Sequence, residues 1–161
     1  MAVGIHILDV LRWLSGKTVR RVCGHATTLR KRVKVEDNAA VLLEFADGTM
    51  GAFDVSWTTH PYEVTTTWYA HHGQLRTAIG AAHPVTVQFA KDGDPTQSLR
   101  KPVHPPIPKA SRHGGAYPYF ARCIRNRIAP FVSGEEGRAS LEVILAAYES
   151  VRRGGWVTLP L

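Results

Sequence analysis

The sequence has few cysteines and no long hydrophobic run. Cys23 and Cys123 are the only two among 161 residues, and they form no Cys-x-x-Cys pair, so we expect two buried thiols rather than a disulfide. No apolar run is long enough to span a bilayer, and the first residues lack a signal peptide's basic region and cleavage site. These absences predict one globular domain over residues 1–161, cytoplasmic and without membrane contact.

Several short catalytic and metal-binding motifs are also absent. The chain has no Gly-x-Ser-x-Gly elbow and no Gly-rich phosphate loop, which excludes the common hydrolase and nucleotide-binding signatures. Eight histidines are present, but no His-Glu-x-x-His occurs, and His71 and His72 would point to opposite faces of a strand. We therefore predict no metal site.

The formal net charge of +7 raises the question of nucleic acid binding. The basic residues are scattered, and 30–34 is the only dense basic run. A solvated turn between two strands explains this run more simply than a phosphate-binding loop does. Nucleic acid binding is therefore the least favoured function.

The stretch 36–59 predicts a central hairpin. Asp47-Gly48 separates two apolar runs, and glycine tolerates the positive φ of a tight turn. A two-residue loop there would place Phe45 opposite Met50 and Leu43 opposite Ala52, which makes both faces of the hairpin apolar. We therefore expect a sheet that is covered on both sides.

The flanking sequence predicts an α+β fold with an open, mainly antiparallel sheet of about six or seven strands. The proline-rich part of residues 91–115 excludes helix and central strand; an ordered loop is favoured over a polyproline ligand. Three helices can cover only one face of such a sheet, so we expect the other face to form a homodimer. The expected helices span 4–15, 117–128 and a long segment after the capping box at Ser133, with Leu141, Ile144, Leu145, Tyr148 and Val151 on its packed face; further strands are expected at 19–29, 64–70, 74–77, 84–90 and 156–159.

The first helix contains the leading candidates for chemistry. His6 is the usual type of general acid or base near neutral pH, and Asp9 follows it at a spacing that lets the two side chains share a helix face. A histidine satisfied structurally by a neighbouring acid is the alternative. Trp13 and His113 are further candidates for lining a substrate cleft, His113 because it precedes a flexible glycine pair.

Three stretches together resemble one family. GIHILDVLRWLSG, EDNAAVLLEFADGTMGAFDVSW and SGEEGRASLEVILAAYESVRRGGWVTLPL are similar to the opening helix, central hairpin and closing helix and strand of the C-terminal domain of the Gfo/Idh/MocA oxidoreductases. The resemblance implies a substrate-binding and oligomerisation domain. It also implies that an N-terminal Rossmann domain, which binds NAD or NADP in the family, is lacking here.

The resemblance assigns His6 to the family's catalytic histidine, a proton shuttle at the substrate hydroxyl or carbonyl. The family has an aspartate four residues earlier, where this chain has Ala2. No strand is followed by Gly-x-Gly-x-x-Gly, so we expect the chain alone to bind no cofactor and to be inactive as a sugar or polyol dehydrogenase. A separate Rossmann-domain chain is one possible partner. A non-catalytic scaffold that binds a small molecule or a partner is the alternative.

Overall fold

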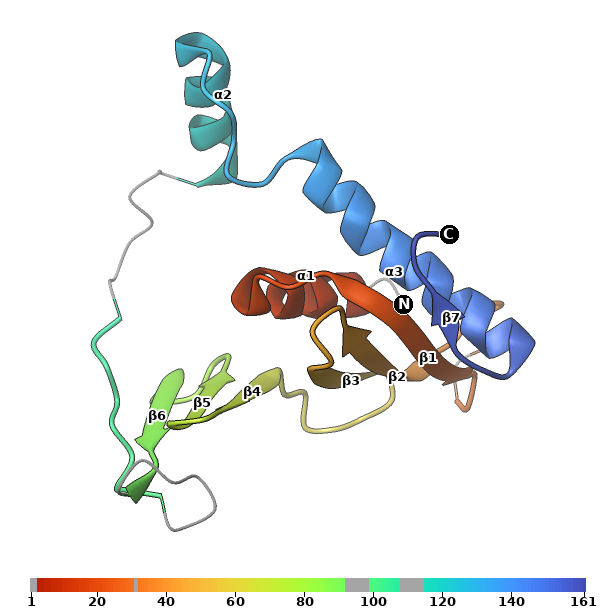
Figure 1. Ribbon diagram of the computed structural model, residues 1–161, viewed down its shortest axis with the longest axis horizontal. Helices are drawn as coiled ribbons and strands as arrows, with labels where there is room; N and C mark the ends of the chain where they lie inside the picture. The colour runs from red at the N-terminus through yellow and green to blue at the C-terminus, as the bar shows by residue number, and fades with distance from the viewer. Residues whose placement is uncertain (1–2, 31, 92–98, 108–114) are drawn as a thin grey trace. The chain divides into compact units, whose positions relative to one another are not determined.

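The computed structural model describes residues 3–30, 32–91, 99–107 and 115–161. They fall into two compact units, Met1–Thr59 with Arg127–Leu161 and His60–Asn126. Figure 1 shows the elements in both units. Within the described residues the elements are α1 (Gly4–Ser15), β1 (Val19–Thr27), β2 (Asn38–Phe45), β3 (Met50–Ser56), β4 (Thr65–Ala70), β5 (Gly73–Ala78), β6 (Val85–Phe89), α2 (Ala116–Asn126), α3 (Gly134–Arg153) and β7 (Val157–Thr158).

The predicted α+β class, the antiparallel pairing and the number of strands are confirmed. The seven strands lie in two sheets, however, with the orders β3-β2-β1-β7 and β4-β5-β6, and not in one continuous open sheet. Residues 57–64 separate β3 from β4 and contain Pro61, which has no N–H to donate to a ladder. The first sheet therefore ends at β3.

The central hairpin forms, but its predicted register is wrong by one residue. The turn has three loop residues rather than two, because Phe45 pairs with Thr49 and the carbonyl of Phe45 accepts from the Gly48 amide at 3.0 Å. Gly48 has φ +84°, as expected for the glycine of a type I turn with a bulge. The extra residue pairs Leu43 with Gly51 and moves the side chains of β3 to the opposite face.

This register gives the four-stranded sheet one buried face and one open face. The buried face carries Val22, Val41, Leu43, Phe45 and Phe53, and α1 and α3 pack on it. The open face is mixed rather than uniformly apolar: Leu42 and Met50 lie there with Glu44 and Asp54. Cys23 also lies on the open face, opposite Leu42, and is partly exposed.

Helix α3 packs on the sheet through small residues, which corrects the predicted face. Of the five residues predicted for the packed face only Ile144 is buried. Ser140, Val143, Ala147 and Ser150 are buried as well, whereas Leu141, Leu145 and Tyr148 are exposed. The small side chains allow a close approach: the Ser150 hydroxyl accepts from the Gly24 amide of β1 at 2.9 Å. The predicted cap at Ser133 is confirmed, and the helix ends at Gly154, whose backbone is left-handed.

The second unit contains β4, β5 and β6, and a segment that was expected to be loop. Val103 exchanges two backbone hydrogen bonds with Val87 of β6, at 2.8 and 2.9 Å, so part of this segment extends the sheet. Gly73 begins β5 with φ +140°, and its α-carbon lies against the backbone of β6. In the part of the chain that the structure describes, no helix is both long and apolar enough to cross a bilayer.

Candidate functional site

Helix α1 presents two different faces. Gly4, Leu8 and Leu11 are buried, and the helix ends at Gly16, whose left-handed backbone donates to the Arg12 carbonyl at 2.9 Å. The opposite face is exposed although it is largely apolar, with Trp13 73% exposed. His6 is exposed as well.

Residues 6, 10 and 13 follow the i, i+4, i+7 spacing that places side chains in one row on a helix. His6, Val10 and Trp13 therefore share the outer row of α1. Within this chain, α1 is therefore buried on one side only.

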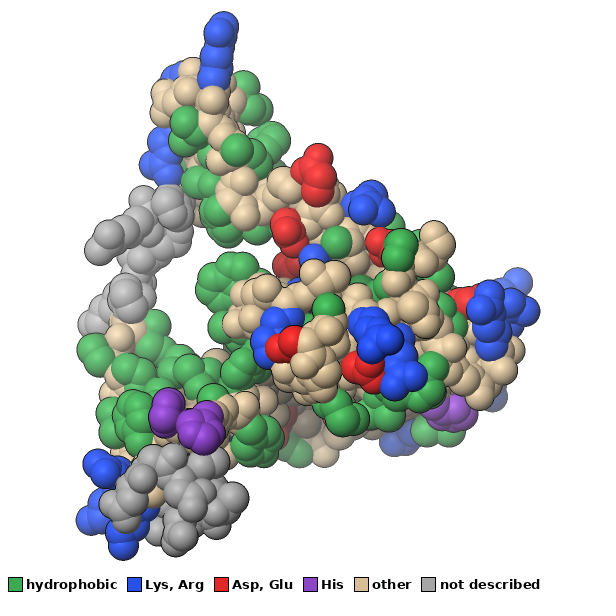
Figure 2. Space-filling model, in the orientation of Figure 1, with side chains coloured by type: hydrophobic (Ala, Val, Ile, Leu, Met, Phe, Trp, Pro, Cys, Tyr) green, Lys and Arg blue, Asp and Glu red, His purple; other side chains and the backbone are tan. Residues whose placement is uncertain are grey.

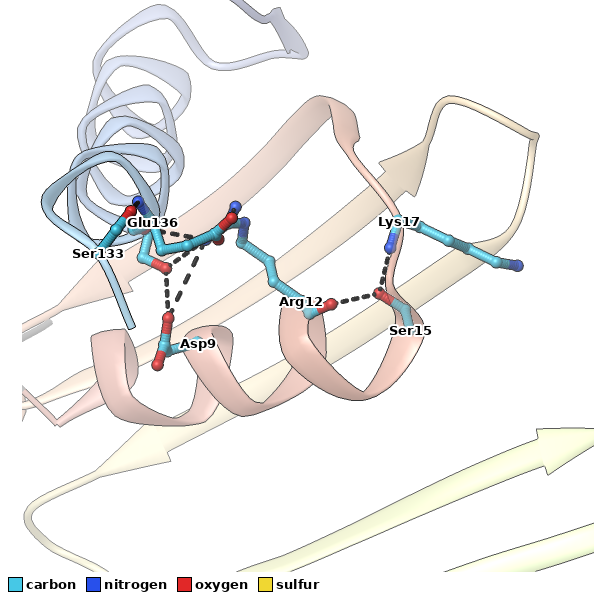
Figure 3. A network of polar contacts seen from close by, with 7 residues as sticks. Asp9, Arg12, Ser15, Lys17, Ser133 and Glu136 are labelled. Atoms are coloured by element: carbon cyan, nitrogen blue, oxygen red, sulfur yellow. Dashed lines mark hydrogen bonds and ion pairs between the residues drawn. The ribbon is translucent and has the colours of Figure 1, made fainter. Parts of the chain in front are cut away.

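A polar network joins α1 to the first turns of α3 (Figure 3). The Arg12 guanidinium, in a side chain only 13% exposed, donates to the Ser140 hydroxyl at 2.6 Å and to the Glu136 carboxylate at 3.0 Å. It also donates to the Glu136 carbonyl at 3.1 Å. Ser140 in turn donates to the Asp9 carboxylate at 2.8 Å. Because charged groups are involved, these hydrogen bonds fix the two helices side by side.

A cavity of about 510 Å³ lies beside this network. Its size is within the range of small-molecule sites. Apolar side chains supplied by α1 and by the segment before α3 form part of its wall, and charged side chains surround them. The lining residues are Asp9, Val10, Arg12, Trp13, Gly16, Lys17, Thr18, Phe131, Val132 and Glu136.

The charges at the edge of the cavity are already paired. The Lys17 ammonium lies 2.7 Å from the Asp47 carboxylate, and together with the Thr49 amide it lowers the pKa of Asp47 to about 2. Arg12 is paired with Glu136. The cavity therefore has no excess of either sign among these four groups.

The structure brings only some of the predicted site residues to the cavity. Asp9 and Trp13 line the same cavity, whereas His6 is outside its lining. The Asp9 carboxylate is bonded to Ser140, and no hydrogen bond joins it to the His6 ring among the described residues. His113 lies outside the described residues.

Sequence reasoning missed Arg12, Glu136 and the pair Phe131 and Val132. No motif marks Arg12 in the sequence, because its partners are more than 120 residues away in the chain. The capping box at Ser133 was the available signal for Glu136. It predicts where α3 begins, but it does not predict which helix lies beside that turn.

Several basic side chains of the first unit are paired with acidic ones. On the face shown in Figure 2, Lys and Arg side chains lie next to Asp and Glu side chains in the unit that contains α3. Glu44 pairs with Arg20 and Arg21, and Glu149 with Arg152 and Arg153. Glu149 consequently has a pKa of about 2.

The described residues do not fit a metal or a dinucleotide. Among them, no group of three or more His, Cys, Asp or Glu side chains could hold a metal ion. Both sheets are antiparallel, and the described part of the chain has no parallel strand pair joined by a helix. A dinucleotide site of the Rossmann type needs such a unit.

The chain is similar to known dehydrogenases over about half of their length. Residues 1–79 match the family model of the GFO/IDH/MocA C-terminal domain. The scyllo-inositol 2-dehydrogenase (NAD(+)) of Bacillus subtilis is 26% identical over 93% of this chain and 44% of its own length. The D-apiose dehydrogenase of Paraburkholderia graminis is 26% identical over 98% of this chain and 44% of its own length.

A solved structure is also matched over somewhat less than half of its length. The WlbA dehydrogenase of Bordetella pertussis, in complex with NADH and UDP-GlcNAcA, is 27% identical with a TM-score of 0.75. The similarity covers 100% of this chain and 45% of that protein. The chain thus spans somewhat less than half of the relatives it matches.

Proposed function

We propose that the chain is the substrate-side and assembly half of a sugar or polyol dehydrogenase, because residues 1–79 match the family model of the GFO/IDH/MocA C-terminal domain. The observation that carries this proposal is the extent of the match, which takes in nearly the whole chain and about 44% of each curated relative. The remaining half of the catalytic machinery, including cofactor binding, then has to come from a Rossmann domain. We propose that the chain is inactive without one.

His6 is the residue we propose for proton transfer. It is exposed at the beginning of α1, where a substrate can reach its imidazole ring. An imidazole can exchange a proton with a substrate hydroxyl. Ala2 replaces the acid expected four residues earlier, so His6 lacks that partner in this chain.

A dehydrogenase assay with and without a cofactor domain tests the proposal. We expect no NAD reduction by the chain alone with scyllo-inositol or D-apiose. Adding the N-terminal part of the Bacillus subtilis relative, which this chain does not match, should produce turnover with one of these two substrates. Replacing His6 in the complemented pair should reduce the rate by about 10²- to 10⁴-fold, the usual contribution of a general acid or base.

His60→Asn is the matched control, because His60 is exposed in the segment between β3 and β4 and lies neither on α1 nor in the four-stranded sheet. Its rate should equal that of the unmodified pair. Turnover by the chain alone would contradict the proposed dependence. Turnover that survives His6→Asn would contradict the assignment of His6.

We also propose a homodimer formed through the open face of the four-stranded sheet. Leu42 and Met50 are exposed there, the latter by 71%, and a second copy is the simplest cover for them. The charged residues of the same face are compatible with this arrangement, because Glu44 is already paired with Arg21 at 2.8 Å.

A non-catalytic binding protein is the second candidate function. The cavity beside Trp13 is the observation that favours it, since its volume is sufficient for a small ligand. A sugar that remains bound to the purified chain would support this alternative over a dehydrogenase half. Nucleic acid binding is supported only by the net charge, and salt-dependent retention on DNA would be required to sustain it.

A further inference from the structure

The loop between β1 and β2 carries the dense basic run of the sequence, and the proposed function does not use it. We propose that this loop, residues 28–37, binds an acidic segment of another polypeptide. The loop and the cavity beside α1 lie at opposite ends of β1, because the cavity is lined by Thr18 and the loop begins after Thr27. A strand of this length spans about 30 Å, so the loop is a separate surface from the candidate site.

The positive charge of this loop is not neutralised by the described part of the chain. Arg30, Arg32 and Lys34 are exposed, and none of them forms an ion pair with a described carboxylate. Every other Lys and Arg that the structure describes in the same unit is paired with a carboxylate, except Arg127. The uncompensated charge of this unit is therefore concentrated at the loop, where it attracts an acidic partner.

Hydrogen bonds hold both ends of the loop in place. The Asp37 carboxylate, in a residue only 3% exposed, accepts from the Leu29 amide at 2.8 Å and from the Arg30 amide at 2.9 Å. The Thr28 hydroxyl donates to the Val35 carbonyl at 2.9 Å across the loop. Because these bonds already order the backbone, the loop loses less conformational entropy when a partner binds.

Apolar side chains lie among the basic ones and decide between classes of partner. Leu29, Val33 and Val35 are 67%, 50% and 64% exposed. A polypeptide can supply carboxylates, to which a guanidinium donates two hydrogen bonds at once, and aliphatic side chains that cover the other three residues. A nucleic acid would leave these aliphatic side chains in water, and residues 28–37 include no aromatic ring on which a base could stack.

The test measures binding of the full chain to a labelled synthetic peptide by fluorescence anisotropy. Arg30 and Lys34 are at most about 14 Å apart along the chain, so a peptide of about ten residues in which glutamate alternates with valine is long enough. We expect it to bind, with a dissociation constant that rises by at least about threefold between about 0.05 M and about 0.2 M salt. A peptide in which serine replaces valine should bind more weakly, because it leaves the aliphatic side chains of the loop uncovered.

The triple variant Arg30→Ser/Arg32→Ser/Lys34→Ser should weaken binding of the glutamate–valine peptide by about tenfold. Each exposed ion pair contributes about 1.5- to 5-fold in affinity, and the variant removes the basic partner of three such pairs. Its melting temperature should equal that of the parent, because the three side chains are exposed and are not paired with a described carboxylate.

The matched control is Arg138→Ser/Arg152→Ser/Arg153→Ser. It also removes three exposed positive charges, so the two variants have the same net charge, but each of these arginines is already paired with a glutamate of α3. Binding of the peptide should therefore change by less than about twofold. Equal weakening by the two triple variants would show that the peptide responds to net charge alone, and the loop would not be the binding surface.

Three other results would overturn the inference. The first is no binding of the glutamate–valine peptide at the lower salt concentration. The second is tighter binding, through the same three basic residues, of a single-stranded oligothymidylate or of vesicles that contain phosphatidylserine. The third is a dimer of the chain alone that the loop variant converts to a monomer, because a second copy would then occupy the loop. None of these results bears on the proposed dehydrogenase half, which the assay with a cofactor domain tests separately.

Discussion

Replacing Gly73 by alanine should unfold the second unit or come close to doing so. A Cβ at this position would lie 2.0 Å from the Gln88 carbonyl oxygen and 2.9 Å from the Phe89 α-carbon. Both are backbone atoms of β6, so no side chain can move aside. The φ of +140° adds strain, because residues with a Cβ rarely adopt it. We expect a loss of at least about 4 kcal/mol in the free energy of unfolding.

Comparing Gly80→Ala with Gly73→Ala separates the cost of the steric clash from the cost of the strained backbone. Gly80 also has a positive φ, +82°, but nothing lies within 4 Å of its Cβ position. The Gly80→Ala substitution should lower the free energy of unfolding by only about 1–2 kcal/mol. Hydrogen exchange of the β5 and β6 amides measures both losses. Equal protection in the two variants would show that the strands separate readily and that the close approach at Gly73 does not stabilise this sheet.

Arg12→Met should loosen α1 from α3. The substitution keeps most of the aliphatic stem but removes donors to Ser140 and to both the carbonyl and the carboxylate of Glu136. Because the guanidinium is mostly buried, water replaces these bonds poorly. We expect a loss of about 2–3 kcal/mol in the free energy of unfolding, visible in urea titration and in faster exchange of the α1 amides.

Arg138→Met is the corresponding control on α3. Arg138 is 74% exposed and lies 3.4 Å from Glu142 on the same helix. Exposed pairs of this kind contribute little, so the change should stay within about 0.5 kcal/mol. Comparable losses in the two variants would mean that the bonds of Arg12 between the helices are no stronger than a surface ion pair.

Local signals in the sequence predicted the elements well and their faces less well. Ser133 and Asp47-Gly48 mark a helix start and a turn through their own backbone preferences, and both were located correctly. One additional loop residue, Ala46, changed the register of the hairpin. The spacing of the apolar residues could not reveal this shift, because in either register apolar side chains of β2 and β3 share a face of the hairpin.

The packed face of α3 was mispredicted for a different reason. The prediction selected the larger side chains, Leu141, Leu145 and Tyr148, whereas the sheet accepts Ser140, Ala147 and Ser150. The close approach of α3 to Gly24 decides which face of the helix packs on the sheet, because a bulkier face would hold α3 away from β1. That constraint joins residues more than 120 positions apart, and so it is not visible in the helix alone.

For the candidate site too, the sequence identified individual residues but not how they are grouped in space. Residue type identified His6, Asp9 and Trp13, because an imidazole, a carboxylate and an indole are each suited to a sugar-binding or proton-transfer role. Their grouping depends on α3 and the segment before it. The structure brings Asp9 and Trp13 to one cavity and leaves His6 further along the row.

The position of Cys23 in the four-stranded sheet provides a built-in chemical probe. Its thiol lies on the open face opposite Leu42, while the second thiol, Cys123, is only 2% exposed. A maleimide should therefore modify Cys23 first in the native chain. If two copies cover this face, the modification rate will fall as the protein concentration rises, and a concentration-independent rate would mean that the face stays in contact with water.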